Sequence, residues 1–339
     1  MSNNKKHTFF HIHHKQGGHA QNIDLTEGAI VKKIIQFAIP LFLGQLLQQF
    51  YNMADAWVVG NFADNNNFAA VSSGGSLTFL IIGFFNGIAV GGGVIISRYY
   101  GARDYKSVQK AIHSNFLFGV VSSVLATVAG LLFIPTLLTW MKTPAEVMPH
   151  SLLYFRIYFA GVATVILYNI CMSIMQALGD SLHPLYYLIF SSLVNVALDL
   201  LLVVAADMGV AGVALATILS QLFSAVLVLA ALMKFPEEYC LNVREIRFHG
   251  WVFRRIVAIG IPAGFQSLMY SLSNALIQTN VNSFGTSTVA AWTAYSKIDA
   301  LFWMMVSSFG IAITTFVGQN YGAGLYMRVR KGVRQCLLL

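Results

Sequence analysis

Charged residues are scarce in this chain of 339 residues: they make up 10% of it, whereas a soluble domain carries about 25%. Hydrophobic residues make up 57%. Apolar runs of roughly 20 residues recur along the sequence, and each is long enough to cross about 30 Å of hydrocarbon. The composition therefore excludes an ordinary soluble domain and predicts an all-α polytopic membrane protein.

Cysteine is also rare. The three cysteines fall in a predicted span or on the side predicted to be cytoplasmic, so we expect no disulfide framework. A secretory leader is not expected either, because the first apolar run is too long and lacks a small-residue cleavage site.

The sequence has no motif of an intramembrane enzyme: neither HExxH nor GxSxG occurs, and His183 is the lone histidine near a membrane end. We therefore do not expect an enzyme, and no cofactor is implied. A membrane sensor or scaffold stays open as an alternative.

The apolar runs predict eight complete spans, with a ninth beginning near Val333. The eight are expected at residues 31–59, 69–97, 110–133, 151–178, 184–206, 210–233, 253–283 and 287–318.

The net charge of +8 is distributed as a membrane topology would distribute it. Of the 21 Lys and Arg residues, five lie before residue 34, four at 98–110, five at 234–255 and four at 328–334. The turns between these segments are nearly uncharged. By the positive-inside rule the N-terminus is cytoplasmic, and the basic excess does not indicate a nucleic-acid partner.

The N-terminal tail, residues 1–29, is rich in histidine. Five histidines lie between His7 and His19, but their spacing matches no closed metal site. We expect a solvated cytoplasmic tail.

Two parts of the chain resemble each other. "IIQFAIPLFLGQLLQQFYN" aligns with "IVAIGIPAGFQSLMYSLSN", which matches Pro40 with Pro262 and Asn52 with Asn274, 222 residues apart in both cases. Six spans separate the copies, so both run in the same direction, as in parallel transporter repeats.

This repeat predicts the domain organisation. We expect a six-helix lobe at 30–233, a cytoplasmic linker at 234–252, and a partial second lobe at 253–339 that lacks most of its last four helices.

Only three acids fall well inside predicted spans: Asp55, Asp199 and Asp299. A charge at the centre of a membrane helix costs about 2.5–3.5 kcal/mol on insertion scales, so such residues indicate a functional site. The alternative is an acid paired with a neighbouring helix for packing. Lys297 and Asp299 are two residues apart and cannot pair on one helical face, so each needs a partner on another helix.

Polar residues share one face in each of three spans, and in lipid such a face must turn inward. The three sets are Gln45, Gln48, Asn52 and Asp55 in the first span, Ser191, Asn195 and Asp199 in the fifth, and Thr217, Gln221 and Ser224 in the sixth.

The segments "LTEGAIVKKIIQFAIPLFLGQLLQQFYNMADAWVVG", "NVALD", "VAGVALATILSQ" and "VGQNYGAG" together resemble the MATE (multidrug and toxic compound extrusion) transporters. The resemblance covers nearly everything from Leu25 onward. It implies a twelve-helix antiporter of two six-helix lobes, which exports mostly cationic lipophilic drugs in exchange for Na⁺ or H⁺.

The sequence looks closest to the prokaryotic DNA-damage-inducible-type branch. In that branch an acid of helix one, an Asn-xxx-Asp pair of helix five and a Thr of helix six form a cation site, and Asp55, Asn195, Asp199 and Thr217 match it. Another branch carries a Glu in helix seven, where Tyr270 stands here, so a second cation site is not expected.

A coupling ion is expected at Asp55 and Asp199. The two carboxylates should converge in a pocket of low dielectric constant, where repulsion and desolvation prevent both from staying ionised alone. The pair would share a proton or bind Na⁺ through hard oxygen ligands.

The substrate cavity is expected between the two lobes, lined by polar and aromatic residues that suit organic cations. The candidates are Gln48, Tyr51, Asn52, Gln266, Tyr270, Asn274, Lys297 and Asp299. A flippase for lipid-linked oligosaccharides stays open as the alternative function, although it would need cationic cavity residues.

The resemblance further implies a bacterial cytoplasmic membrane protein. It would act as a monomer, with small organic cations and membrane lipid as its partners.

Overall fold

The computed structural model describes residues 22–62, 65–141 and 143–339, with backbone alone for 62, 65–82, 282, 286 and 290. Within these ranges every regular element is a helix. The elements are α1 (Ile30–Phe62), α2 (Asn65–Gly101), α3 (Tyr105–Trp140), α4 (Met148–Ala177), α5 (Leu182–Asp199), the π-helical η1 (Leu200–Ala205), α6 (Gly209–Met233), the 3₁₀ turn η2 (Val243–Glu245), α7 (Gly250–Asn282), α8 (Thr286–Gly322) and α9 (Tyr326–Leu338).

Seven of the described helices are long and apolar enough to cross a membrane: α1, α3, α4, α5 with η1, α6, α7 and α8. Each of the eight predicted spans lies inside one of α1–α8, with η1 counted with α5, or extends past it by one residue, and the helices are longer by up to seven residues at one end. The histidines of the tail lie outside the described residues.

The helix expected near Val333 begins earlier, at Tyr326. Its first turns carry Arg328, Arg330, Lys331 and Arg334. These basic residues hide the start of α9 from a search for apolar runs.

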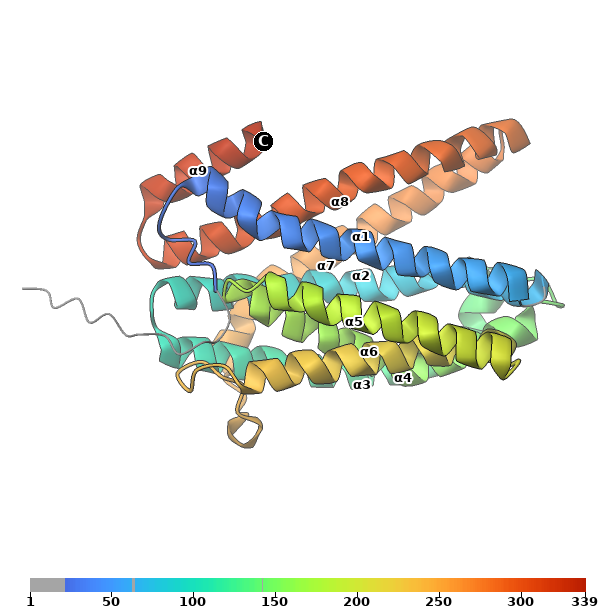
Figure 1. The fold of residues 1–339 in the computed structure, drawn as a ribbon, viewed down its shortest axis with the longest axis horizontal. Helices are drawn as coiled ribbons and strands as arrows, with labels where there is room; N and C mark the ends of the chain where they lie inside the picture. The colour runs from blue at the N-terminus through green and yellow to red at the C-terminus, as the bar shows by residue number, and fades with distance from the viewer. Residues whose placement is uncertain (1–21, 63–64, 142) are drawn as a thin grey trace, which may run out of the picture.

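The helices alternate in direction (Figure 1). The connections α2–α3, α4–α5, α6–α7 and α8–α9 all lie at one end, which we call the basic end because residues 98–110, 234–255 and 328–334 belong to it. Antiparallel neighbours joined by short connections are the arrangement expected of successive spans.

Helix α4 is at the centre of the first six helices, packed on α2, α3 and α6. Its aromatic residues Phe155 and Phe159 and its Ile174 are fully buried. The largest hydrophobic core is built on α2, α3 and α4. A face that is apolar and buried in this way offers no polar group to a ligand. A binding site is therefore expected beside it, at the polar faces of α1, α5 and α6.

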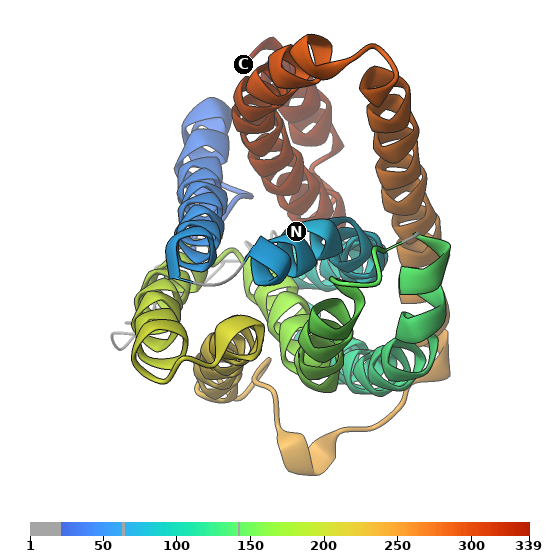
Figure 2. The ribbon, with the colours of Figure 1, turned by 90° about the vertical axis from the view of Figure 1, so that its right-hand side faces the viewer.

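The second repeat contacts the first mainly through α2. Seen from the end opposite the basic end, α1 and α2 lie between α8 on one side and α4–α6 on the other (Figure 2). Helix α7 crosses α2 at glycines: a Cβ atom placed on Gly87 would lie 2.5 Å from the Cα of Gly264, and one on Gly91 would lie 2.7 Å from the Cα of Gly260. The two backbones touch there because neither helix presents a side chain.

Nearer the basic end α8 is equally close to α2. A Cβ atom on Gly318 would overlap the hydroxyl of Ser97, and one on Gly322 would overlap the carbonyl oxygen of Arg98. Toward the other end α7 and α8 swing away as a hairpin (Figure 1). The structure is therefore closed at the basic end and open at the opposite one.

Gly87→Ala is expected to destabilise the protein by about 1–3 kcal/mol, the usual cost of overpacking, because the new methyl group meets backbone that cannot move aside. Gly310→Ala is the matched control, since nothing lies within 4 Å of its Cβ position. Thermal unfolding of both variants in detergent measures the difference. Equal melting temperatures would show that the α2–α7 crossing is not as tight as described.

Candidate functional site

The polar face of α5 is turned into the protein. Asn195 and Asp199 are each 1% exposed, and the buried hydroxyl of Ser191 donates to the carbonyl oxygen of Ser220 at 2.8 Å, which ties α5 to α6. Asp199 is the last α-helical residue before the π-helical turn η1. Such turns are frequent at functional sites, and no sequence signal announced this one.

Asp55 of α1 lies opposite Asp199. Helix α1 packs along α5, and the two carboxyl groups are close enough to interact with each other. Asp55 is half-buried, whereas Asp199 is buried. The structure thus brings together two acids that are 144 positions apart in the sequence.

The acidic pair lies among polar atoms that lack partners. Among the described residues, none supplies a hydrogen bond to Oδ1 of Asp55, to either carboxylate oxygen of Asp199, to the side-chain amide of Asn195 or to Oε1 of Gln221. Buried polar atoms are nearly always paired, so a cluster of exceptions needs an explanation. A proton or a cation held by these oxygens would supply one.

The donors available here are hard oxygens. Throughout the described part of the chain, no three His, Cys, Asp or Glu side chains come close enough to hold a metal ion together. Two carboxylates with an amide oxygen suit Na⁺ or a proton better than a thiophilic metal.

Tyr51 belongs to the same cluster. Its hydroxyl lies beside the amides of Gln48 and Gln221 and interacts with both carboxylates, and Tyr154 of α4 interacts with them as well. Sequence reasoning placed Tyr51 in the cavity between the lobes, whereas the structure places its hydroxyl at the acidic pair. It missed Tyr154 altogether, because no polar periodicity marks α4.

Thr217 lies on α6 one turn before Gln221. Its hydroxyl donates to the carbonyl oxygen of Val213 at 3.0 Å, within its own helix, and its side chain is half-buried. An oxygen that donates in this way keeps its lone pairs for a ligand.

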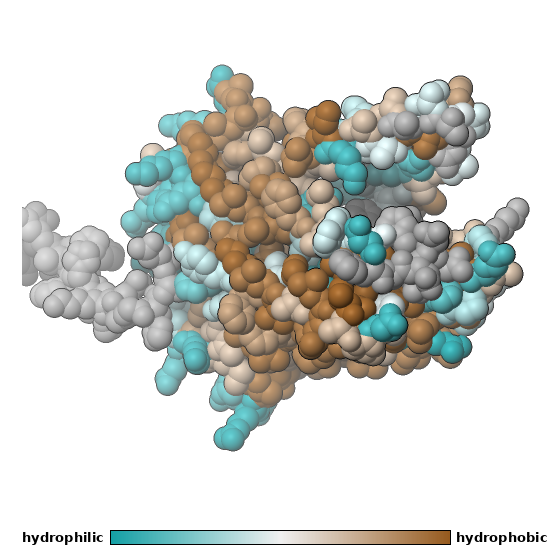
Figure 3. All heavy atoms as spheres, turned by 45° about the vertical axis from the view of Figure 1, so that its right-hand side comes forward, coloured by the Kyte–Doolittle hydropathy of each residue, from teal (hydrophilic) through white to brown (hydrophobic). Residues whose placement is uncertain are grey.

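The residues expected in the substrate cavity are mostly exposed: Gln48, Asn52, Gln266, Tyr270, Asn274 and Lys297 all have open surface. The ring of Tyr270 meets that of Trp303 edge-on at 5.6 Å, which joins α7 to α8. Asp299 accepts a hydrogen bond from Tyr295 at 3.3 Å on its own helix. Figure 3 shows the surface hollowed between the α7–α8 hairpin and the first six helices.

Comparison with known proteins supplies the family. The MatE family model matches residues 40–201 and 262–339. The two matches begin at Pro40 and Pro262, the prolines that the internal repeat aligns.

Two curated relatives are named as multidrug resistance proteins. The chain is 28% identical to the probable multidrug resistance protein YpnP of Bacillus subtilis (strain 168), over 90% of this chain and 68% of that protein. It is 29% identical to the probable multidrug resistance protein YoeA of the same organism, over 88% of this chain and 66% of that protein. The chain thus spans about two thirds of the length of these relatives.

Among solved structures, a multidrug resistance MATE family transporter in an outward-facing conformation superposes with a TM-score of 0.87 at 22% identity, covering 94% of this chain and 71% of that one. Its likeness concerns the fold. Together with the family match over most of the sequence, it leaves one conclusion: the chain belongs to the MATE family of multidrug efflux transporters, and it is an integral membrane protein.

Proposed function

We propose that this protein is a secondary antiporter that exports organic cations in exchange for Na⁺ or H⁺. The observation that carries the proposal is the acidic pair of half-buried Asp55 and buried Asp199 between α1 and α5, with unpaired oxygens around it. Charges inside a membrane protein cost considerable free energy, so they indicate a function, and binding of a coupling ion is such a function.

The mechanism follows from the charge of the pair. When the site is empty, two carboxylates face each other and repel. Binding of one cation removes that repulsion and draws α1 toward α5, and its release reverses the change. An ion can shift a conformational equilibrium only through different affinities for the two states. We propose that the separation of α1 and α5 is what differs at this site between the two states.

Orientation follows from the charges at the helix ends. The basic end, with Arg98, Arg103, Lys106 and Lys110 among its residues, faces the cytoplasm by the positive-inside rule. The α7–α8 hairpin then opens to the outside of a bacterial cytoplasmic membrane. In this orientation the structure corresponds to the state that releases substrate.

Organic cations fit the open side. The recess between the hairpin and the first six helices adjoins the aromatic pair Tyr270–Trp303. Aromatic faces attract cations by about 0.5–2 kcal/mol. The relatives named as multidrug resistance proteins support a broad range of substrates rather than a single one. One copy of the chain supplies both helices of the acidic pair, so we propose a monomeric transporter.

Dye efflux from inside-out vesicles tests the proposal, with the Na⁺ and pH gradients imposed separately. One of the two gradients is expected to drive accumulation of a cationic dye, and its collapse by an ionophore should end the transport. Transport that ignores both gradients would contradict antiport. Movement of an anionic lipid-linked sugar in place of the dye would favour the flippase alternative.

A further inference from the structure

A short segment before α1 crosses the basic end of the molecule. We call residues 22–29 the strap. Its apolar side chains Ile23 and Leu25 are 6% and 0% exposed, and they pack with Phe37 of α1 and Phe316 of α8. The strap is therefore an ordered part of the fold, and the prediction of a solvated tail is wrong for residues 22–29.

Two amides of α8 hold the strap by its backbone. Gln319 accepts a hydrogen bond from the N–H of Leu25 at 3.4 Å, and Asn320 donates to the carbonyl oxygen of Leu25 at 3.1 Å. The two side chains are 1% and 0% exposed. Together they use both backbone groups of one residue, as a neighbouring β-strand would.

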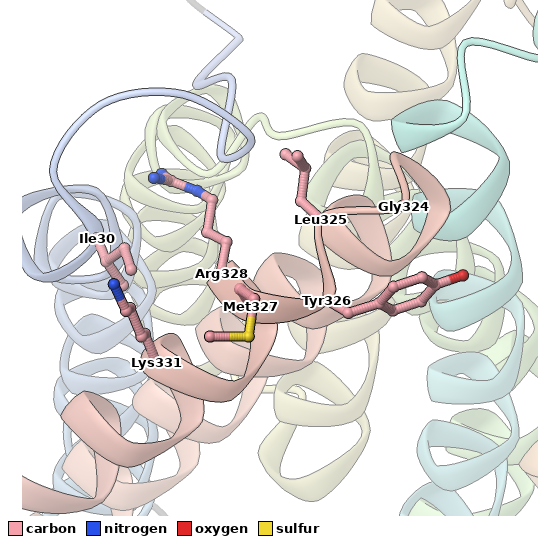
Figure 4. Close-up of a pocket in the computed structure, with 7 residues that line it drawn as sticks. All are labelled: Ile30, Gly324, Leu325, Tyr326, Met327, Arg328 and Lys331. Carbon is pink, nitrogen blue, oxygen red and sulfur yellow. The ribbon is translucent and has the colours of Figure 1, made fainter.

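Arg328 of α9 holds the other end of the strap. Its guanidinium donates to the carbonyl oxygens of Gly28 at 2.7 Å, of Glu27 at 3.0 Å and of Leu25 at 3.2 Å. In Figure 4 this side chain reaches from α9 toward the segment before α1, while Lys331 on the next turn lies beside Ile30. One arginine thus binds three carbonyl groups of the strap.

The same contacts reach α4. Gln319 also donates to the carbonyl oxygen of Ala177 at 3.1 Å, and the N–H of Ile23 donates to the carbonyl oxygen of Gly179 at 3.0 Å. The end of α8 is therefore connected to α4 of the first repeat, both directly through Gln319 and through the strap. These bonds join the two repeats at the end where the structure is closed.

We propose that Gln319, Asn320 and Arg328 form a releasable latch, which holds the strap and keeps the basic ends of the two repeats together while the opposite end is open. Every bond of the latch to the first repeat involves a backbone N–H or C=O group. Once the basic end opens, these backbone groups can bond to water instead, so the latch can break and re-form without leaving a charge unpaired. The inference rests on the proposed antiport, because only alternating access requires the basic end to open.

A reversible cross-link tests whether the latch must open. Thr26 of the strap and Ala323 after α8 line the same pocket at the basic end, so cysteines there are reachable by a short bis-methanethiosulfonate reagent. The background would carry alanine at Cys171, Cys240 and Cys336. Cross-linking is expected to lower efflux at least about tenfold, with recovery on reduction. Cross-linked protein that exports at the uncross-linked rate would overturn the proposal.

A second measurement needs no transport, so it separates failure of the latch from failure of the proposed function. Ser97 is 1% exposed at the closed α2–α8 contact. In Ser97→Cys protein with alanine at Cys171, Cys240 and Cys336, an impermeant maleimide added from the basic side reports opening there. Asn320→Asp and Gln319→Glu keep the side-chain shape, but each removes the amide donor to the first repeat or the strap and places an acid at a buried position. They are expected to speed labelling at least roughly fivefold, the effect of losing one hydrogen bond.

Arg328→Ala should act in the same direction as the two amide variants, whereas Arg330→Ala is the matched control, because that exposed arginine of α9 is not part of the latch. Labelling rates that are unchanged in Asn320→Asp, Gln319→Glu and Arg328→Ala would overturn the latch whether or not the protein transports.

Discussion

Asp55→Asn and Asp199→Asn are each expected to lower coupled efflux by about 100-fold, the upper range of coupling between two ligand sites. Asparagine keeps the size of the side chain but cannot exchange a proton or attract Na⁺ with a full charge. Removing one carboxylate also removes the repulsion that separates α1 from α5 in the empty state. The measurement is gradient-driven dye efflux from vesicles with equal amounts of protein.

The matched control is Asp207→Asn, in the turn after η1. Asp207 has a positive φ of 52°, a conformation that asparagine tolerates as well as aspartate does. This variant should transport normally. Wild-type efflux in both Asp55→Asn and Asp199→Asn would remove the acidic pair from the mechanism.

Asn195→Leu is expected to stabilise the protein while it removes coupling. Both polar atoms of this buried side chain lack a partner among the described residues. An unpaired buried group costs about 1–3 kcal/mol, and a leucine of similar shape relieves that cost. We therefore expect a melting temperature in detergent that is higher by a few degrees, together with a weaker response of efflux to the driving ion.

Ser191→Ala, on the same face of α5, is expected to have the opposite effect on stability. Its hydroxyl is bonded to the carbonyl oxygen of Ser220, so its loss should destabilise the protein by about 1 kcal/mol. If Asn195→Leu melted lower than the parent protein, the side chain would be a structural element rather than a ligand.

The sequence predicted the spans well, because hydrocarbon thickness fixes their length and apolarity marks them. The start of α9 was not predicted, because the basic residues of its first turns lower the apolarity to that of a loop. The π-helical turn after Asp199 was not predicted either, for another reason. Valines and leucines fill α-helical and π-helical turns alike, so residues 200–205 carry no distinguishing pattern.

The site was predictable only in part. Helical spacing shows which residues share a face, but not which neighbour that face meets. Tyr51 shares α1 with the exposed Gln48 and Asn52, yet its hydroxyl lies at the acidic pair. The latch was not predicted, although Gln319 and Asn320 lie in the segment "VGQNYGAG", because their partners are backbone groups, which every residue has.

The glycine crossing of α2 and α7 has a mechanical consequence. Two backbones that touch without interlocking side chains form a pivot, and Gly264 lies 14 residues from the start of α7 and 18 from its end. At 1.5 Å per residue the two lever arms measure about 21 and 27 Å. Tilting α7 by about 10° as a rigid rod moves its far end by about 5 Å and its near end by about 4 Å in the opposite direction. The displacement of the near end exceeds the reach of any hydrogen bond. When the α7–α8 hairpin closes the open end, it therefore separates the basic end, so that the two ends open and close in opposite directions.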